Sequence, residues 1–421
     1  MKITKIVFTL IVLWTVSNIF GQGGSLYSRN GIGDNIYTHS ARRMGLGGLG
    51  FAAVDKDYLS SINPAGLYKL DLTRFEVGLN YDGMLLTDSK NSKYYSNYSF
   101  SGFTIGFPLQ KDYGIVGSLG LLPVSTVSYN VKTNSVTASG AGQETTSSSF
   151  KYSGDGGLSK IFVGLTYKLP LNFILGGTFD YYTGKIDYNS TLEYYNDSQY
   201  GNLQYINKRS YYGAGGSLGL ITSDLSSVFG SEKIENFKLA IYYNLGTNLT
   251  TDTSLTSVTS IGTIIKDKGI VETKVPYKIG VGASLTWNKN YLILVDYLYQ
   301  PWSEYSFDGI NSGSLENLNK AVLSLEYSGD TRRIGTSFWD DIVLRGGFGY
   351  EQTQYEINGT RIETISAHAG FSFPLGIGNT IDLGFEYGIR GTTDSQLIKE
   401  NILRANVSIS FGELWFIRQD R

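Results

Sequence analysis

Apolar and polar residues alternate over most of the chain, from residue 72 to residue 416. In each alternating segment every second residue is apolar over about ten positions, and aromatic residues stand near the ends. Clear examples are residues 75–81, 161–167, 237–245, 277–287, 381–389 and 403–411. A period of two is the repeat of a β-strand with two different faces, and this length is typical of strands that cross a membrane. The pattern therefore predicts an all-β protein.

Two all-β architectures have strands in which apolar and polar residues alternate in this way, a soluble β-sandwich and a transmembrane antiparallel β-barrel. The positions of the charges distinguish them, because a lysine or arginine on the lipid face near the bilayer centre costs about 2–4 kcal/mol. In the segments given above, no Asp, Glu, Lys or Arg falls in the apolar phase. The opposite phase carries both signs, at Arg74, Glu76, Lys160, Asp180, Lys238, Lys278, Asp296, Arg345, Asp382, Glu386, Arg390 and Arg404. This distribution favours a barrel with an ion-paired interior.

About fourteen alternating segments follow one another, and the connections between them alternate in length. The short connections are Pro108–Asp112, Pro170–Asn172, Asn288–Asn290 and Pro374–Thr380. The long ones are Gly83–Asn97, Lys132–Gly156, Asp187–Asn207, Asn248–Ile270 and Glu304–Leu318. Membrane barrels of bacteria have short periplasmic turns and long outer loops. We therefore expect residues 72–421 to form one barrel of about 14 strands in the outer membrane.

The first 21 residues have the pattern of a secretory signal peptide. Lys2 and Lys5 precede an apolar run from Ile6 to Trp14, and small or polar residues follow it. A secreted or periplasmic protein could carry the same leader. No later apolar run is long enough for a transmembrane helix, so membrane residence requires a barrel.

Residues 22–71 break the alternation and are rich in glycine. This stretch contains Met44 and Phe51 and ends near Asn63, Pro64, Ala65 and Gly66. Pro64 removes a backbone donor and moves Asn63 away from helical geometry, which marks a fixed corner. The corner could be an ordinary turn. Alternatively, the whole stretch is a compact segment that needs the barrel around it as a container.

The order and spacing of Ala41, Met44-Gly45-Leu46-Gly47-Gly48, Asp55 and Asn63-Pro64-Ala65-Gly66-Leu67 resemble the N-terminal hatch of the FadL-type transporters of long-chain fatty acids and hydrocarbons. Trp302-Ser303-Glu304-Tyr305 and Phe411-Gly412-Glu413-Leu414-Trp415-Phe416 are similar to later parts of Bacteroidetes-like members. The resemblance implies an outer-membrane barrel with residues 22–71 as a hatch inside it. It also implies passive uptake of a hydrophobic ligand and its release sideways at a kinked third strand.

Pro123 lies within the third alternating segment. Residues 113–121 keep one apolar phase, and Val127, Tyr129 and Val131 resume it beyond the proline. Proline deletes a ladder donor, so the strand must break here, either as a tolerated bulge or as the border of a gap in the wall. We predict a lateral gate at Leu121, Leu122, Pro123 and Val124. The ligand-binding residues predicted with it are Val116, Leu122, Val124, Met44 and Phe51.

Composition adds restrictions to this interpretation. The formal net charge is −2, which gives no reason to expect a nucleic-acid partner, and the chain has no cysteine and two histidines. His39 and His368 are interpreted as structural, because no nucleophile or base motif accompanies them. We therefore predict no catalytic residue, cofactor or metal site. Calcium on loop carboxylates and a barrel enzyme are the weaker alternatives.

The predicted function is passive uptake of hydrophobic small molecules through a hatch-plugged, monomeric barrel. Its surroundings are outer-membrane lipid and lipopolysaccharide. The alternative is a FadL-like barrel that acts as a scaffold or shuttle in a protein secretion machine.

Overall fold

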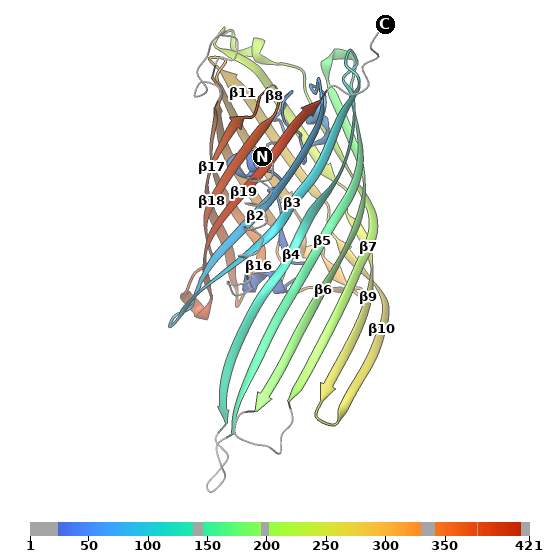
Figure 1. Ribbon diagram of the computed structural model, residues 1–421, viewed down its shortest axis with the longest axis vertical. Helices are drawn as coiled ribbons and strands as arrows, with labels where there is room; N and C mark the ends of the chain where they lie inside the picture. Colours follow the sequence, from blue (N-terminus) through green and yellow to red (C-terminus); the bar gives the residue numbers. More distant parts are fainter. Residues whose placement is uncertain (1–23, 138–145, 195–201, 330–341, 377, 414–421) are drawn as a thin grey trace, which may run out of the picture.

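The computed structural model describes residues 24–137, 146–194, 202–329, 342–376 and 378–413. Within these residues the chain forms a closed antiparallel barrel with 14 wall strands (Figure 1). Two of the wall strands are each divided by a short break, into β8 and β9 and into β10 and β11. The strands are β2 (Thr73–Thr87), β3 (Ser92–Gln110), β4 (Ile115–Thr137), β5 (Thr146–Lys168), β6 (Ile174–Tyr194), β7 (Leu203–Ile221), β8 (Ile234–Asn244), β9 (Thr247–Thr259), β10 (Gly262–Val275), β11 (Lys278–Trp287), β12 (Tyr291–Gln300), β15 (Leu318–Tyr327), β16 (Val343–Ile357), β17 (Thr360–Pro374), β18 (Thr380–Arg390) and β19 (Lys399–Glu413).

The predicted phase of the wall strands is confirmed. The apolar residues of the alternating segments face outward and are exposed, as at Leu79, Val163 and Phe385. The charged residues of the opposite phase face inward, and Arg74, Asp180 and Asp382 are fully buried. Because each unpaired backbone group in lipid costs several kcal/mol, the wall closes on itself. The ladder between β19 and β2 completes it, from Lys399 opposite Thr87 to Glu413 opposite Thr73.

The prediction of long loops is wrong for most of the outer connections. Strands continue through them, so that β9 and β10 are joined by a tight turn from Thr259 to Gly262, and β2 and β3 pair as far as Thr87 and Ser92. The connection after β12 contains η6 (Trp302–Glu304), β13 (Ser306–Phe307) and β14 (Ile310–Asn311). Threonine and tyrosine are good strand formers, and beyond the membrane both faces of a strand can be polar. The alternation is lost there although the strand continues.

Strands β4 to β7, β9 and β10 project well beyond the rest of the barrel, at its lower end in Figure 1. We call this part the extension. It consists of residues 124–137 of β4, 146–157 of β5, 185–194 of β6, 203–211 of β7, and β9 with β10. The short turns lie at the opposite end of the barrel, which is the periplasmic end in proteins of this class. The extension therefore projects from the cell surface.

The N-terminal segment, residues 24–71, lies among the inward-facing side chains of the wall. Its elements are η2 (Leu26–Arg29), β1 (Asp34–Asn35), α2 (Ala41–Gly45) and η3 (Pro64–Leu67). α2 packs on β16 to β19, η3 on β5 to β7, and η2 and β1 on β4. No helix among the described residues is long and apolar enough to cross a membrane. The predicted signal peptide, residues 1–21, lies outside the described residues.

Candidate functional site

The ladder between β3 and β4 ends halfway up the wall. Its last backbone pair is Phe103 with Leu121. Beyond this pair β3 continues against β2 alone, while β4 continues against β5. Farther out, the Tyr95 hydroxyl donates a hydrogen bond of 3.1 Å to the Asn130 carbonyl oxygen and bridges the two strands again. We call the interval between these two contacts the seam.

The predicted gate residues lie at the inner end of the seam. Leu122 is fully buried. Pro123 pairs with Ser159 of β5, but the next pair joins Ser125 to Leu158, so Val124 is an extra residue in a β-bulge. A bulge exchanges the two faces of a strand.

Beyond this bulge the phase predicted from the sequence is wrong. Val127 is fully buried against the N-terminal segment, although the alternation placed it on the outer face with Leu121. The neighbouring strand accommodates the bulge with two glycines that have positive φ, Gly156 (φ 125°) and Gly157 (φ 157°). A Cβ atom at Gly157 would lie 2.2 Å from the Ser125 carbonyl oxygen. Only glycine permits this close approach.

A strand of the N-terminal segment covers the edge of β4 that β3 leaves open. In β1, Asp34 is the backbone partner of Thr126 and Asn35 that of Ser125. The Ile36 amide then donates to the Val124 carbonyl oxygen at 3.0 Å. The edge donors and acceptors of β4 are therefore partly satisfied from inside the barrel, as buried backbone groups must be.

A cavity of about 300 Å³ lies against the seam. Residues of β3 (Asn97, Ser99, Phe100), of β4 (Pro123, Ser125, Thr126) and of the N-terminal segment line one part of it. Charged residues of the opposite wall line the rest, including Asp82, Lys320, Glu351, Glu386, Arg390 and Arg404. This cavity thus combines charged side chains with a similar amount of apolar surface.

Buried ion pairs hold β1 beside this cavity. The Arg390 guanidinium lies 3.0 Å from Asp34 and 2.5 Å from Glu400. The Tyr355 hydroxyl donates to the second oxygen of Asp34 at 2.8 Å. Movement of β1 would take Asp34 away from Arg390 and leave a buried charge uncompensated, which is costly. These contacts therefore fix the position of β1. The sequence pattern identified Arg390 as inward-facing but gave no sign of Asp34.

A second network holds α2. Arg42 makes two hydrogen bonds to Glu326 of β15, at 3.0 and 3.1 Å, and a third to Asp55 at 3.0 Å. Arg345 of β16 reaches the same Glu326 at 2.5 Å. Arg43 instead binds carbonyl oxygens within the segment, those of Leu49 and Gly50. One arginine attaches the segment to the wall, and the other organises its glycine-rich turn.

The predicted Asn-Pro-Ala-Gly motif forms the corner that leads into η3. The Asn63 side chain accepts a hydrogen bond from the Ala65 amide at 3.0 Å and donates one to the Phe51 carbonyl oxygen at 2.8 Å. Pro64 is the first residue of η3, where its missing N–H is not needed. The wall approaches the motif very closely, since a Cβ atom at Gly219 of β7 would lie 1.8 Å from the Asn63 Oδ1 atom.

The five predicted ligand-binding residues occupy different environments. Val116, Leu122, Met44 and Phe51 are fully buried and packed. Phe51 stacks on Tyr242 with ring centroids 5.4 Å apart. Val124 and Phe51 also line a small cavity of about 60 Å³, together with Lys160 and Lys278. None of the five lines the cavity of about 300 Å³, and their ligand-binding role stays a prediction.

Both histidines are buried. His368 shares a hydrogen bond of 2.9 Å with Ser366 and is the register partner of Glu386, but that carboxylate lies 2.9 Å from Arg404 and is already paired. His39 belongs to the N-terminal segment. Burial, together with the positive charges of Lys160 and Lys278, lowers the pKa of His39 to about 3. His39 is therefore neutral at ordinary pH.

The sequence profile of the BamG family matches residues 2–420, almost the whole chain. This chain belongs to the BamG family. No curated protein matches it.

Among solved structures, this BamG-family barrel is similar to the toluene transporter TbuX of Ralstonia pickettii, with a TM-score of 0.59 and 15% identity over 90% of this chain and 99% of that one. A FadL homologue of Pseudomonas aeruginosa gives a TM-score of 0.60 and 10% identity over 90% and 99% of the two chains. The toluene transporter TodX of P. putida gives 0.59 and 15% over 91% and 100%. At these identities the likeness establishes the fold, which is the FadL-type barrel.

Proposed function

We propose that this BamG-family barrel lets small hydrophobic molecules pass from the cell surface into the outer membrane through the seam, without a covalent step. The observation that carries the proposal is the early end of the β3–β4 ladder at Phe103 and Leu121, beside the cavity of about 300 Å³. A closed barrel has no edge, so an interrupted ladder is the place where a ligand can leave sideways. The FadL-type fold shared with two toluene transporters supports the same interpretation.

The cavity lining narrows the class of ligand. Asp82, Glu386 and Arg404 form a charged group on its wall, and Lys320 lies 3.0 Å from Glu351. A purely apolar molecule next to these groups would remove them from water without replacing their hydrogen bonds, which is unfavourable. An amphipathic ligand avoids this cost, because its polar head can face the charges while its tail enters the seam.

The N-terminal segment acts in this proposal as the hatch. β1 lies on the edge of β4 at Ser125 and Thr126, so the ligand can pass only when β1 moves. The ion pair of Asp34 with Arg390 holds the closed state. A ligand that binds the open state better shifts the equilibrium toward it.

Substitutions at the seam test the proposal. Pro123→Val restores a backbone donor and a good strand former, so β4 can pair further with β3. Val124→Trp fills the inner side of the bulge. We expect both to reduce uptake of a labelled long-chain fatty acid severalfold in cells that produce the protein at equal outer-membrane abundance. The control is Val163→Trp, on a lipid-facing position of β5. Uptake by both seam variants at the parent level would reject a lateral exit.

The second candidate is a structural role, as a scaffold or shuttle in a protein secretion machine. The network of Arg42, Glu326 and Arg345 favours it, because it fastens the N-terminal segment to the wall through buried ion pairs. A barrel built to stay closed serves as a rigid support. Mass spectrometry of the purified protein separates the two candidates. A co-purified fatty acid or hydrocarbon supports uptake, whereas a lipid-free barrel with a stoichiometric secretion partner supports the scaffold.

A further inference from the structure

The small cavity of about 60 Å³ lies between the N-terminal segment and the wall. The segment contributes His39 and Ser61 to its lining, and the wall contributes Lys160 of β5 and Lys278 of β11. Apolar side chains make up much of the rest, among them Leu49, Phe51, Ile62 and Leu298. Two ammonium groups therefore border one small space inside the barrel.

The charges of these two lysines are not balanced in the same way. Lys160 lies 3.1 Å from Asp180, whose carboxylate is fully buried. Lys278 forms no ion pair with any residue that the structure describes. Its ammonium group donates one hydrogen bond, of 3.4 Å, to the Oδ1 atom of Asn35. The cavity is therefore bordered by one positive charge that has no paired negative charge.

Two titratable neighbours of Lys278 do not supply the missing charge. Glu351 attracts Lys278, but its carboxylate is already paired with Lys320 at a distance of 3.0 Å. His39 is neutral, because burial and the two lysines lower its pKa to about 3. A positive charge beside apolar side chains is costly when no counter-charge accompanies it. The surroundings of Lys278 therefore favour an anion from solution.

The N-terminal segment supplies polar groups that can bind such an anion. The Oγ atom of Ser61 and the Nδ1 atom of His39 are buried, and neither has a hydrogen-bond partner in the described part of the chain. Both residues line the cavity. A serine hydroxyl donates its hydrogen, and a neutral imidazole donates from the ring nitrogen that carries the proton. An anion in the cavity can thus accept hydrogen bonds from the segment and from Lys278.

We propose that this cavity binds one small monovalent inorganic anion, such as chloride, between the N-terminal segment and the wall. One negative charge balances the unpaired ammonium group of Lys278, whereas a divalent anion would leave an excess of negative charge. The volume of about 60 Å³ is enough for a halide ion with a few water molecules, since one water needs about 10–15 Å³. The same volume excludes the chain of a fatty acid.

The anion forms a third attachment of the segment to the wall, besides the two networks of buried ion pairs. Lys278 contacts Asn35 of β1, and Ile36 lines the cavity next to it. An anion that neutralises Lys278 therefore stabilises the contact of β1 with β11. Unlike the ion pairs, this attachment depends on the composition of the solution. The inference concerns the attachment alone and does not rest on uptake through the seam.

Thermal unfolding of the full chain in detergent, followed by tryptophan fluorescence, tests the proposal. A ligand that binds only the folded state raises the unfolding temperature as its concentration rises. Sodium chloride is compared with sodium gluconate at equal ionic strength, so that screening is the same and the larger anion cannot enter the cavity. Above the dissociation constant, we expect each tenfold increase in chloride to raise the unfolding temperature by about 1–2 °C. Gluconate should have no such effect.

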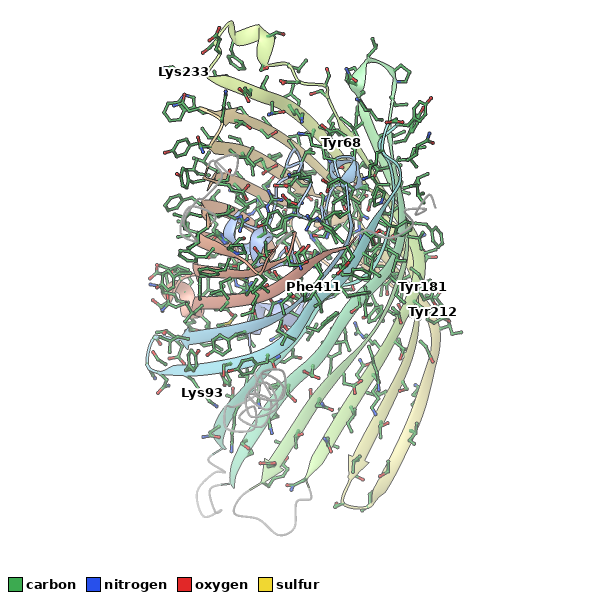
Figure 2. All side chains as sticks on the ribbon, turned by 45° about the horizontal axis from the view of Figure 1, so that its top comes forward. Tyr68, Lys93, Tyr181, Tyr212, Lys233 and Phe411 are labelled. Carbon is green, nitrogen blue, oxygen red and sulfur yellow. The ribbon has the colours of Figure 1, made fainter. Side chains whose placement is uncertain are left out.

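Lys278→Met should abolish the dependence on chloride. In gluconate this variant should unfold at a temperature no lower than the parent, because it lacks the uncompensated cation. The control is Lys233→Met, an exposed lysine that Figure 2 shows near η5 (Ser226–Phe229), and it should respond to chloride like the parent. Ser61→Ala keeps the charge and removes one donor, so it should weaken chloride binding about fivefold. It provides the answer if Lys278→Met does not fold.

Crystals of the full chain soaked in sodium bromide locate the ion. We expect an anomalous peak in the cavity beside Lys278 for the parent and none for Lys278→Met. Water or an acyl chain at that place would overturn the proposal, as would equal unfolding temperatures in chloride and gluconate. A bromide peak without any effect of chloride on stability would mean binding at crystal concentration only, and it would overturn the proposal as well. A failed uptake experiment leaves it standing.

Discussion

Asp34 and Thr126 are backbone partners across the inner edge of the wall, although they belong to the N-terminal segment and to β4. Their pairing places a strand from inside the barrel on an edge that the neighbouring wall strand has left. The Asp34 carboxylate is at the same time 3.0 Å from Arg390 on β18. One residue thus connects the seam to a distant part of the wall.

Asp34→Asn should loosen this connection. The amide cannot balance the Arg390 charge, although Glu400 still pairs with it at 2.5 Å. We expect more frequent channel openings in planar bilayers, with the barrel still folded. The control is Asp55→Asn, because Arg42 keeps its two bonds to Glu326 when Asp55 is neutral. Equal opening frequencies in parent and Asp34→Asn would show that this ion pair does not hold β1.

Deletion of residues 22–70 should leave a folded barrel with a larger ion conductance. Apart from the edge of β4 that β1 covers, the wall strands pair with one another and do not need the segment. Asp296, which accepts the Phe51 amide at 2.8 Å, and Glu326 lose partners, so heat-induced unfolding should occur at a lower temperature. Unchanged conductance would mean that the segment does not block the pore.

Gly219→Ala should weaken the docking of the Asn-Pro-Ala-Gly motif. The added Cβ atom would lie 1.8 Å from the Asn63 Oδ1 atom, and the overlap can be relieved only by moving the motif. Overpacking of this kind costs about 1–3 kcal/mol. Gel mobility after heating measures the loss of stability. Gly313→Ala, where a Cβ atom meets nothing within 4 Å, should behave like the parent.

Stability should decrease as the pH falls through the range set by His39. Its pKa is lowered from 6.5 to about 3 by burial and by the neighbouring Lys160, Lys278 and Arg43. Below about pH 6.5 the unfolded chain therefore binds a proton at His39, which the folded chain binds only near pH 3. Between these two values the free energy of unfolding decreases by at most about 1.4 kcal/mol for each pH unit. His39→Gln should flatten this part of a plot of unfolding temperature against pH. A parallel curve for the variant would show that His39 does not contribute.

The membrane part of the fold could be predicted because lipid imposes a simple rule on each strand: apolar side chains face the lipid and charged side chains face the interior. Val163 and Phe385 had to face outward, and Asp180 and Asp382 had to face inward. Beyond the membrane this rule no longer applies. Residues such as Thr251 and Thr253 belong to a continuous strand, yet their neighbourhood shows no alternation and was predicted as loop.

The seam was predictable only in part. Pro123 indicated a break, but the exchange of faces beyond it depends on Gly156 and Gly157 of the neighbouring strand. That contact is tertiary, and nothing in the local sequence of β4 indicates its direction. β1 is two residues long and has no repeat at all, so its pairing with β4 is visible only in the three-dimensional structure.

The ladder between β19 and β2 has a consequence for the order of assembly. It joins the last wall strand to the first, so the ring cannot close before the whole chain has been made. The N-terminal segment is synthesised first, but the partners of Arg42 and Asp34 are Glu326 and Arg390, which arrive late. The segment must therefore remain without its ion pairs until β15 and β18 are in place. It has to be enclosed as the ring closes, since a wall completed earlier would exclude it.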